Sequence, residues 1–148
     1  MSKTGVMIRT VLRFALAALL VVAGVSHLTW GRRGYRIVVP DWATQLLHTD
    51  KDMIVVASGA AEIMLGGALV VLPKDRRTIG ALVAAFFVAV FPGNVYQWQT
   101  GRSAPGMRTD RARFIRLLLQ PLLVVWALWS TWSTPSTRST PSARSTAK

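Results

Sequence analysis

The stretch that decides the fold is MIVVASGAAEIMLGGALVVL, residues 53–72. It holds a single charged side chain, that of Glu62, among apolar and small residues. At about 1.5 Å of rise per residue, a helix of this length just crosses a hydrocarbon layer of about 30 Å. The sequence therefore predicts a transmembrane helix here, ended by the charged turn that begins at Pro73.

Three further apolar stretches predict transmembrane helices. They lie at residues 7–28, 78–98 and 114–132, and polar or charged segments separate them. In the polar connection 29–52, Pro40 should stop any helix before a short surface helix at 42–47. Pro92 and Gly93 are expected to interrupt the third span near its end. We therefore predict an all-α, integral membrane four-helix bundle over residues 7–132.

The last sixteen positions, residues 133–148, form a tail of Ser, Thr, Pro and Arg. Its six-residue segment STPSTR is followed at once by STPSAR, a near repeat. The tail has no large apolar side chain that could join a core. We therefore predict that it is disordered.

The charge of the chain points to lipid rather than nucleic acid. Among 148 residues, 18 Lys and Arg stand against 6 Asp and Glu, a formal net charge of +12. Nearly all the basic residues lie between or beyond the apolar stretches, where anionic headgroups are, and not over a soluble face. Cysteine is absent, which excludes disulfides, thiolate nucleophiles and thiolate metal centres. We expect no metal site and no binding to nucleic acid.

The numbers of basic residues on the two sides of the membrane are nearly equal and favour one orientation only slightly. Four spans place both termini and the turn at 73–77 on one side, with nine basic residues there and eight, or nine with Arg116, on the other. The compact cluster at 74–77 and the basic N-terminal segment favour both termini inside. We expect a bacterial cytoplasmic membrane.

Six polar side chains fall in one half of the predicted bilayer, toward the connections 29–52 and 99–113. Polar groups inside a membrane are costly, so each is a candidate for binding. Ser58 and Glu62 share one helical face, as do Arg116 and Gln120, and Gly59 and Gly66 allow another backbone close to the first face. The candidate ligand-binding residues are His27, Ser58, Glu62, Asn94, Arg116 and Gln120. Plain apolar packing is expected in the other half, around Leu20, Leu69, Val83 and Val124.

The same polar residues also have a structural interpretation. Glu62 and Arg116 could form an ion pair in which each neutralises the other. Asn94 and Gln120 could satisfy carbonyl groups freed by nearby prolines, and His27 could be a hydrated interfacial residue. The sequence is compatible with both interpretations, a ligand pocket and a structural polar cluster.

Four motifs, one in each span, resemble those of the DoxX-like family of small four-helix membrane proteins. They are Ala23-Gly24-Val25-Ser26-His27, Ser58-Gly59-Ala60-Ala61-Glu62-Ile63 with Gly66, Phe91-Pro92-Gly93-Asn94-Val95-Tyr96, and Arg116-Leu117-Leu118-Leu119-Gln120 followed by Trp126-Ala127-Leu128. The resemblance covers about residues 10–130, and Leu118 stands where the family commonly has proline. It implies a four-helix membrane fold. It also implies a link to quinone-coupled oxidation of sulfur compounds or to redox-stress complexes at the membrane.

Two functional hypotheses follow. In the first, the chain is a redox-associated membrane subunit that binds a quinone or a small anion. Arg116 would hold negative charge, Glu62 and His27 would move protons, and Asn94 and Gln120 would orient the ligand. The electrons would belong to a bound cofactor or a partner redox subunit, so we expect no stand-alone enzyme activity. In the second, the chain is a non-catalytic scaffold or assembly partner of a larger membrane complex.

Overall fold

The computed structural model of the chain describes residues 2–103 and 108–132. In chain order, its helices are α1 (Lys3–Leu28), α2 (Arg32–Arg36), α3 (Asp41–Leu47), α4 (Lys51–Val71), α5 (Arg76–Gln99) and α6 (Asp110–Thr131). The described ranges contain no strand. Helices α1, α4, α5 and α6 are long and apolar enough to cross a membrane. The predicted all-α four-helix membrane fold is confirmed, while the predicted disorder of 133–148 lies outside the described residues.

Two expectations about the helices need correction. Pro92 and Gly93 do not end or break the third span, because α5 runs through both to Gln99. A proline removes one backbone donor, and inside a bundle the neighbouring helices can compensate for that loss. The connection 29–52 also contains α2, which has only five residues and no apolar periodicity to reveal it in the sequence. The surface helix expected at 42–47 is present as α3, which begins directly after Pro40.

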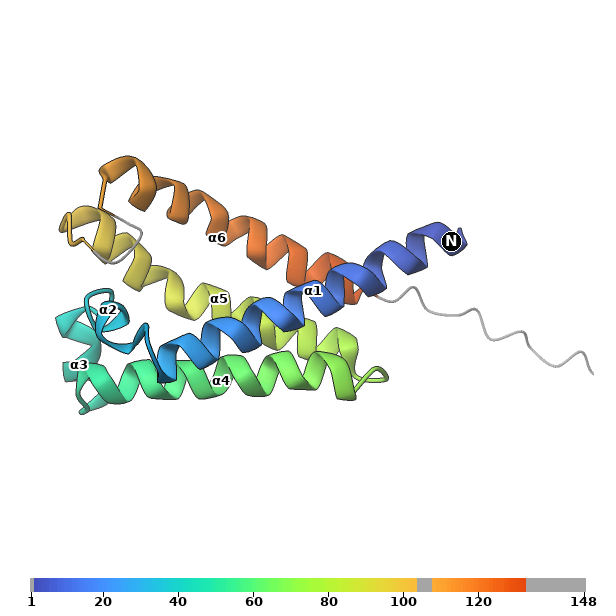
Figure 1. The fold of residues 1–148 in the computed structure, drawn as a ribbon, viewed down its shortest axis with the longest axis horizontal. Helices are drawn as coiled ribbons and strands as arrows, with labels where there is room; N and C mark the ends of the chain where they lie inside the picture. Colours follow the sequence, from blue (N-terminus) through green and yellow to red (C-terminus); the bar gives the residue numbers. More distant parts are fainter. Residues whose placement is uncertain (1, 104–107, 133–148) are drawn as a thin grey trace, which may run out of the picture.

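The four long helices form two antiparallel pairs. Helix α1 packs along α4, α5 packs along α6, and α1 also touches α6. Figure 1 shows that the two pairs diverge toward the end of the molecule where α2 and α3 lie. At the opposite end the pairs are close, and the indole Nε1 of Trp126 on α6 donates to the carbonyl oxygen of Leu12 on α1 at 3.1 Å. The bundle is therefore closed at one end and open at the other.

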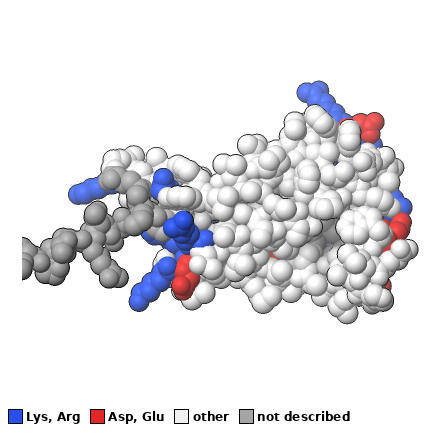
Figure 2. Space-filling model, turned by 180° about the vertical axis from the view of Figure 1, so that it is seen from behind, with Lys and Arg blue, Asp and Glu red and all other residues white. Residues whose placement is uncertain are grey.

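The apolar core fills the half of the bundle where the pairs meet. It is built from Leu16, Ala17, Leu20, Leu69, Val83, Ala84, Phe87 and Ala127, with Val124 packed against it. This is the half for which the sequence predicted plain apolar packing. Large apolar side chains also cover the outside of the spans, as expected of a lipid-facing surface. Figure 2 shows this surface as an almost entirely white middle, with charged atoms gathered toward the two ends.

Glycines set the distance between α1 and α4. A Cβ on Gly24 would lie 2.5 Å from the carbonyl oxygen of Gly59, and a Cβ on Gly66 would lie 2.8 Å from that of Ala17. Real side chains do not come this close to a backbone, so only glycine permits the contact. Small residues at such crossings let helix backbones pack tightly in membranes. The expected close approach at Gly59 and Gly66 is confirmed.

This contact gives a test with a matched control on the neighbouring residue. We expect Gly66→Ala to destabilise the fold by about 1–3 kcal/mol, because α1 and α4 must separate to accept the methyl group. Gly67→Ala should be neutral or stabilising by up to about 1 kcal/mol, because a Cβ on Gly67 has no neighbour within 4 Å. Unfolding of the two variants in detergent measures the difference. Equal effects would show that the glycine contact does not hold the pair together.

Candidate functional site

A cavity of about 510 Å³ lies between the two helix pairs, at the end where they diverge. Side chains of all six helices line it, with Tyr35 from α2, together with the segment 38–40 between α2 and α3. Most of the wall is apolar, from residues such as Leu20, Val55, Phe87, Val90, Leu119 and Leu123. A volume of this size suits a small organic molecule.

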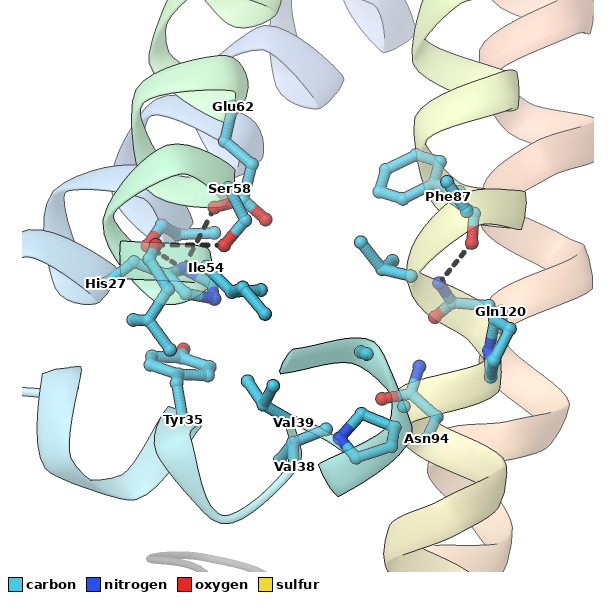
Figure 3. Close-up of a pocket in the computed structure, with 18 of the residues that line it drawn as sticks. His27, Tyr35, Val38, Val39, Ile54, Ser58, Glu62, Phe87, Asn94 and Gln120 are labelled. Atoms are coloured by element: carbon cyan, nitrogen blue, oxygen red, sulfur yellow. Dashed lines mark hydrogen bonds and ion pairs between the residues drawn. The ribbon is translucent and has the colours of Figure 1, made fainter. Parts of the chain in front are cut away.

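All six residues singled out in the sequence line this one cavity: His27, Ser58, Glu62, Asn94, Arg116 and Gln120. They come from four different spans, and Figure 3 shows His27, Ser58 and Glu62 on one wall facing Asn94 and Gln120 on the other. The divergence of the helix pairs keeps the two groups apart. Polar groups that could have bonded each other therefore face a shared space.

One wall is built around the pair of His27 and Glu62. The imidazole Nδ1 lies 2.9 Å from Glu62 Oε2 and 2.8 Å from the carbonyl oxygen of Ala23. A carbonyl can only accept, so Nδ1 carries a proton and donates it to Ala23. Glu62 Oε2 lies beside the same nitrogen, yet it is buried with no hydrogen-bond partner among the described residues. A buried oxygen of this kind is costly and would gain from a donor on a ligand.

Tyr35 fixes the histidine ring from the other side. The two rings stack with centroids 3.6 Å apart and an interplanar angle of 18°. The Tyr35 hydroxyl lies 3.0 Å from Ser26 Oγ, within hydrogen-bond distance. Tyr35 is not among the candidate residues identified from the sequence, because the path of the 29–52 connection could not be predicted. The sequence contains no spacing signal that would have linked Tyr35 to His27.

The opposite wall carries two amides with different surroundings. Gln120 on α6 donates from Nε2 to the carbonyl oxygen of Phe87 on α5 at 2.9 Å, so it ties the second pair together. Asn94 is only 5% exposed, and its side chain makes no hydrogen bond with the described part of the chain. Asn94 therefore does not satisfy carbonyl groups near Pro92, and Gln120 bonds across to α5 rather than near Pro121. The Asn94 amide therefore lines the cavity without a hydrogen-bond partner among the described residues.

Arg116 is held by a residue that the sequence analysis missed. Its Nη1 donates to Gln97 Oε1 at 3.2 Å, and Gln97 Nε2 donates to the carbonyl oxygen of Arg102 at 3.2 Å. Gln97 is 1% exposed and lies three residues after Asn94, a helical spacing that could have revealed it. The ion pair considered between Glu62 and Arg116 is not formed; the Glu62 carboxylate instead lies 2.9 Å from His27 Nδ1.

Ser58 and the α3 region complete the site. Ser58 Oγ donates to the carbonyl oxygen of Val55 at 2.9 Å, within its own helix. Helix α3 and residues 38–40 cover the cavity end, and Asp41 anchors them through contacts to Lys51 Nζ at 2.5 Å and Tyr96 Oη at 3.0 Å. These two hydrogen bonds, first that from Lys51 and then that from Tyr96, lower the pKa of Asp41 below its usual value of 3.8.

The described residues contain no group of three or more His, Cys, Asp or Glu side chains able to hold a metal ion. What the cavity offers a ligand is hydrogen bonding, charge and apolar surface. A family model described as a domain of unknown function (DUF8561) matches residues 16–131. The chain belongs to this family. No curated protein and no solved structure matches it.

The match to the DUF8561 family includes all six candidate residues that line the cavity and most of the four long helices. It carries no activity, because the family is described as one of unknown function. The resemblance to the DoxX-like family stays a prediction. The residues of the cavity are therefore the basis for any proposal about its chemistry.

A double-mutant cycle tests the pairing on the first wall. We expect His27→Gln and Glu62→Gln to be coupled by about 1 kcal/mol or more, because removing either partner leaves the other buried without its contact. The cycle between Glu62→Gln and Arg116→Gln should give a coupling at most half as large. Unfolding free energies in detergent provide both values. A larger coupling to Arg116 would contradict the pairing seen here.

The anchoring of α3 should respond to acid but not to mild changes of pH. Because the pKa of Asp41 is lowered in the folded protein, its stabilising contacts are fully present above 3.8 and are lost as the pH falls through the folded-state value. Hydrogen exchange of the α3 amides should stay constant between pH 8 and pH 5 after correction for intrinsic rates. Asp41→Asn should raise this exchange at pH 7. Loosening of the wild-type helix near pH 6 would instead implicate a histidine.

Proposed function

We propose that this protein binds a quinone, or an amphiphilic molecule built like one, in the cavity between its helix pairs. The observation that carries the proposal is an apolar cavity that contains two polar groups without a hydrogen bond to the described residues: Glu62 Oε2, which touches only His27 Nδ1, and the Asn94 amide. Buried polar groups normally have hydrogen-bond partners. In its quinol form a quinone carries hydroxyl groups at two edges of a flat ring, so one hydroxyl can donate to Glu62 Oε2 while the opposite oxygen accepts from the Asn94 amide.

The distribution of polar groups over two walls supports this class of ligand. Asn94 on one wall can donate to a ring oxygen, and the Glu62–His27 pair on the other can hold or release a proton near a second oxygen. Reduction of a quinone to a quinol takes two electrons and two protons. The protein would contribute binding and proton handling, and a partner redox subunit would contribute the electrons. This is the role of a redox-associated membrane subunit, which the DoxX-like resemblance also implies.

A small anion is a second candidate, and Arg116 is the observation that favours it. Its guanidinium lines the cavity and is oriented by Gln97. The predominantly apolar wall fits a quinone better, because an anion of a few atoms would leave most of that surface without contact. A scaffold role without any ligand is the remaining alternative. It predicts that joint Glu62→Gln and Arg116→Gln exchange is tolerated in the assembled complex.

The cavity position also fits delivery from the membrane. With both termini on the inner side of a bacterial cytoplasmic membrane, as we expect from the basic cluster at 74–77, the cavity would lie in the outer half of the bilayer. A quinone dissolves in the hydrocarbon and can reach this depth without crossing water. The α3 helix, with Trp42 partly exposed beside the cavity, lies at the corresponding interface.

The proposal is tested by titrating the purified protein with decylubiquinone and following quenching of tryptophan fluorescence. We expect Asn94→Leu to weaken binding roughly tenfold, as for the loss of one buried hydrogen bond. Its thermal stability should be unchanged or higher, because the amide has no protein partner to lose. Ser130→Ala, which removes a buried polar group at the far end of α6, is the control and should bind as wild type.

Two results would overturn the proposal. One is saturable binding that is the same in wild type and Asn94→Leu. The other is the absence of saturable quinone binding in a folded wild-type protein. If sulfite or another small anion then shifts the stability of wild type but not of Arg116→Gln, the anion interpretation would take its place.

A further inference from the structure

The basic residues at the two ends of the bundle differ in whether they have acidic partners. At the cavity end, five basic residues have acidic partners: Asp52 contacts Arg32 and Arg36, Asp41 contacts Lys51 and Arg102, and Asp110 contacts Arg113. At the other end Asp75 is the only acidic residue, and its carboxylate forms no ion pair with the described part of the chain. Figure 2 shows blue and red side by side at the first end and mainly blue at the second.

Arg13 is the exceptional residue at this second end. It is 7% exposed, and its Nε is buried without a hydrogen-bond partner among the described residues. Its contact is with an aromatic ring, that of Phe14, whose centroid lies 5.1 Å from the guanidinium carbon. The charged group that acts on it most is another cation, Arg76 at the start of α5. A buried cation without a counterion is costly, so the site lacks an anion.

The register of α1 against α4 gives the depth of Arg13. Gly24 lies against Gly59 and Ala17 against Gly66, so Arg13, one turn before Ala17, is level with Val70. Helix α4 ends one residue later, at Val71, while α1 extends ten residues beyond Arg13 toward its start. Arg13 therefore lies where the hydrocarbon ends and lipid phosphates begin.

Neighbouring residues extend the positive charge around Arg13 along the same interface. Arg9 lies 5.2 Å from the ring of Trp129 and donates to the carbonyl oxygen of Trp132, and Arg77 lies 4.9 Å from the ring of Trp132. Tryptophan rings prefer headgroup depth, so these contacts hold the guanidinium groups at the level of the phosphates. We call Arg9, Arg13, Arg76 and Arg77 the basic end cluster.

We propose that the basic end cluster binds the phosphate of an anionic phospholipid headgroup, with Arg13 as its buried contact. The phosphate would supply the acceptor oxygens that Arg13 lacks and would offset the repulsion between Arg13 and Arg76. Guanidinium groups suit phosphate because they can donate two parallel hydrogen bonds. This site lies at the end of the bundle opposite the cavity and does not depend on the quinone proposal.

The test measures lipid binding to the full-length protein by native mass spectrometry, with phosphatidylglycerol and phosphatidylcholine as probes. We expect phosphatidylglycerol to bind the wild type several-fold more tightly. Arg13→Gln should weaken phosphatidylglycerol binding roughly fivefold or more, which corresponds to the loss of one basic contact. Arg33→Gln is the matched control, because Arg33 is exposed at the other end and forms no ion pair with the described residues. It should retain wild-type binding.

Equal binding of the two lipids, or equal losses in Arg13→Gln and Arg33→Gln, would overturn the proposal, because either result means attraction by net charge alone. If Arg13→Gln does not fold, Arg76→Gln replaces it and should still weaken phosphatidylglycerol binding several-fold; unchanged binding would count against the site. Inorganic phosphate and glycerol phosphate in large excess identify the source of the anion. Failure to displace the lipid supports a headgroup site, and full displacement would assign the site to a soluble anion instead.

Discussion

The close contact between α1 and α4 at Gly24, Gly59 and Gly66 is the constraint on which the rest of the structure depends. It brings the backbones near enough for His27 on α1 to reach Glu62 on α4. It makes these two helices a unit, so the bundle divides into two pairs that can diverge at one end. The same register sets Arg13 level with the end of α4. Both the cavity and the basic end cluster thus follow from one helix crossing.

Polar groups without partners lie at different depths at the two ends of the molecule. At the cavity end, acidic residues pair with several surface cations, and the polar groups without a hydrogen bond to the described residues are inside, at Glu62 and Asn94. At the other end the core is apolar, and the unmatched charge is at the membrane interface, at Arg13. In a bilayer such atoms cannot turn to water for partners, so each is a place where a ligand lowers the free energy. A neutral ring suits the first end and an anion the second.

The sequence predicted much of this because the membrane simplifies the problem. Uninterrupted apolar runs identified the four spans, and helix periodicity with alternating topology gathered the six polar residues in one half of the bilayer. The sequence could not predict which side chains these six residues would contact. Helix pairing decides that Glu62 meets His27 rather than Arg116, and it depends on side-chain contacts between spans far apart in sequence. Tyr35 was missed because short helices such as α2 leave no periodic signal, and Pro92 was misjudged because the bundle tolerates it.

In our proposal, the cavity binds an amphiphilic ligand through Glu62 and the groups that face it. The most direct measurement is mass spectrometry of the small molecules that remain bound when the protein is purified from bacterial membranes in mild detergent. Wild type and Glu62→Gln are compared side by side. We expect a quinone that is bound to the wild type and lost from the variant. Wild-type protein that carries only phospholipid, with the same molecules in both samples, would contradict it.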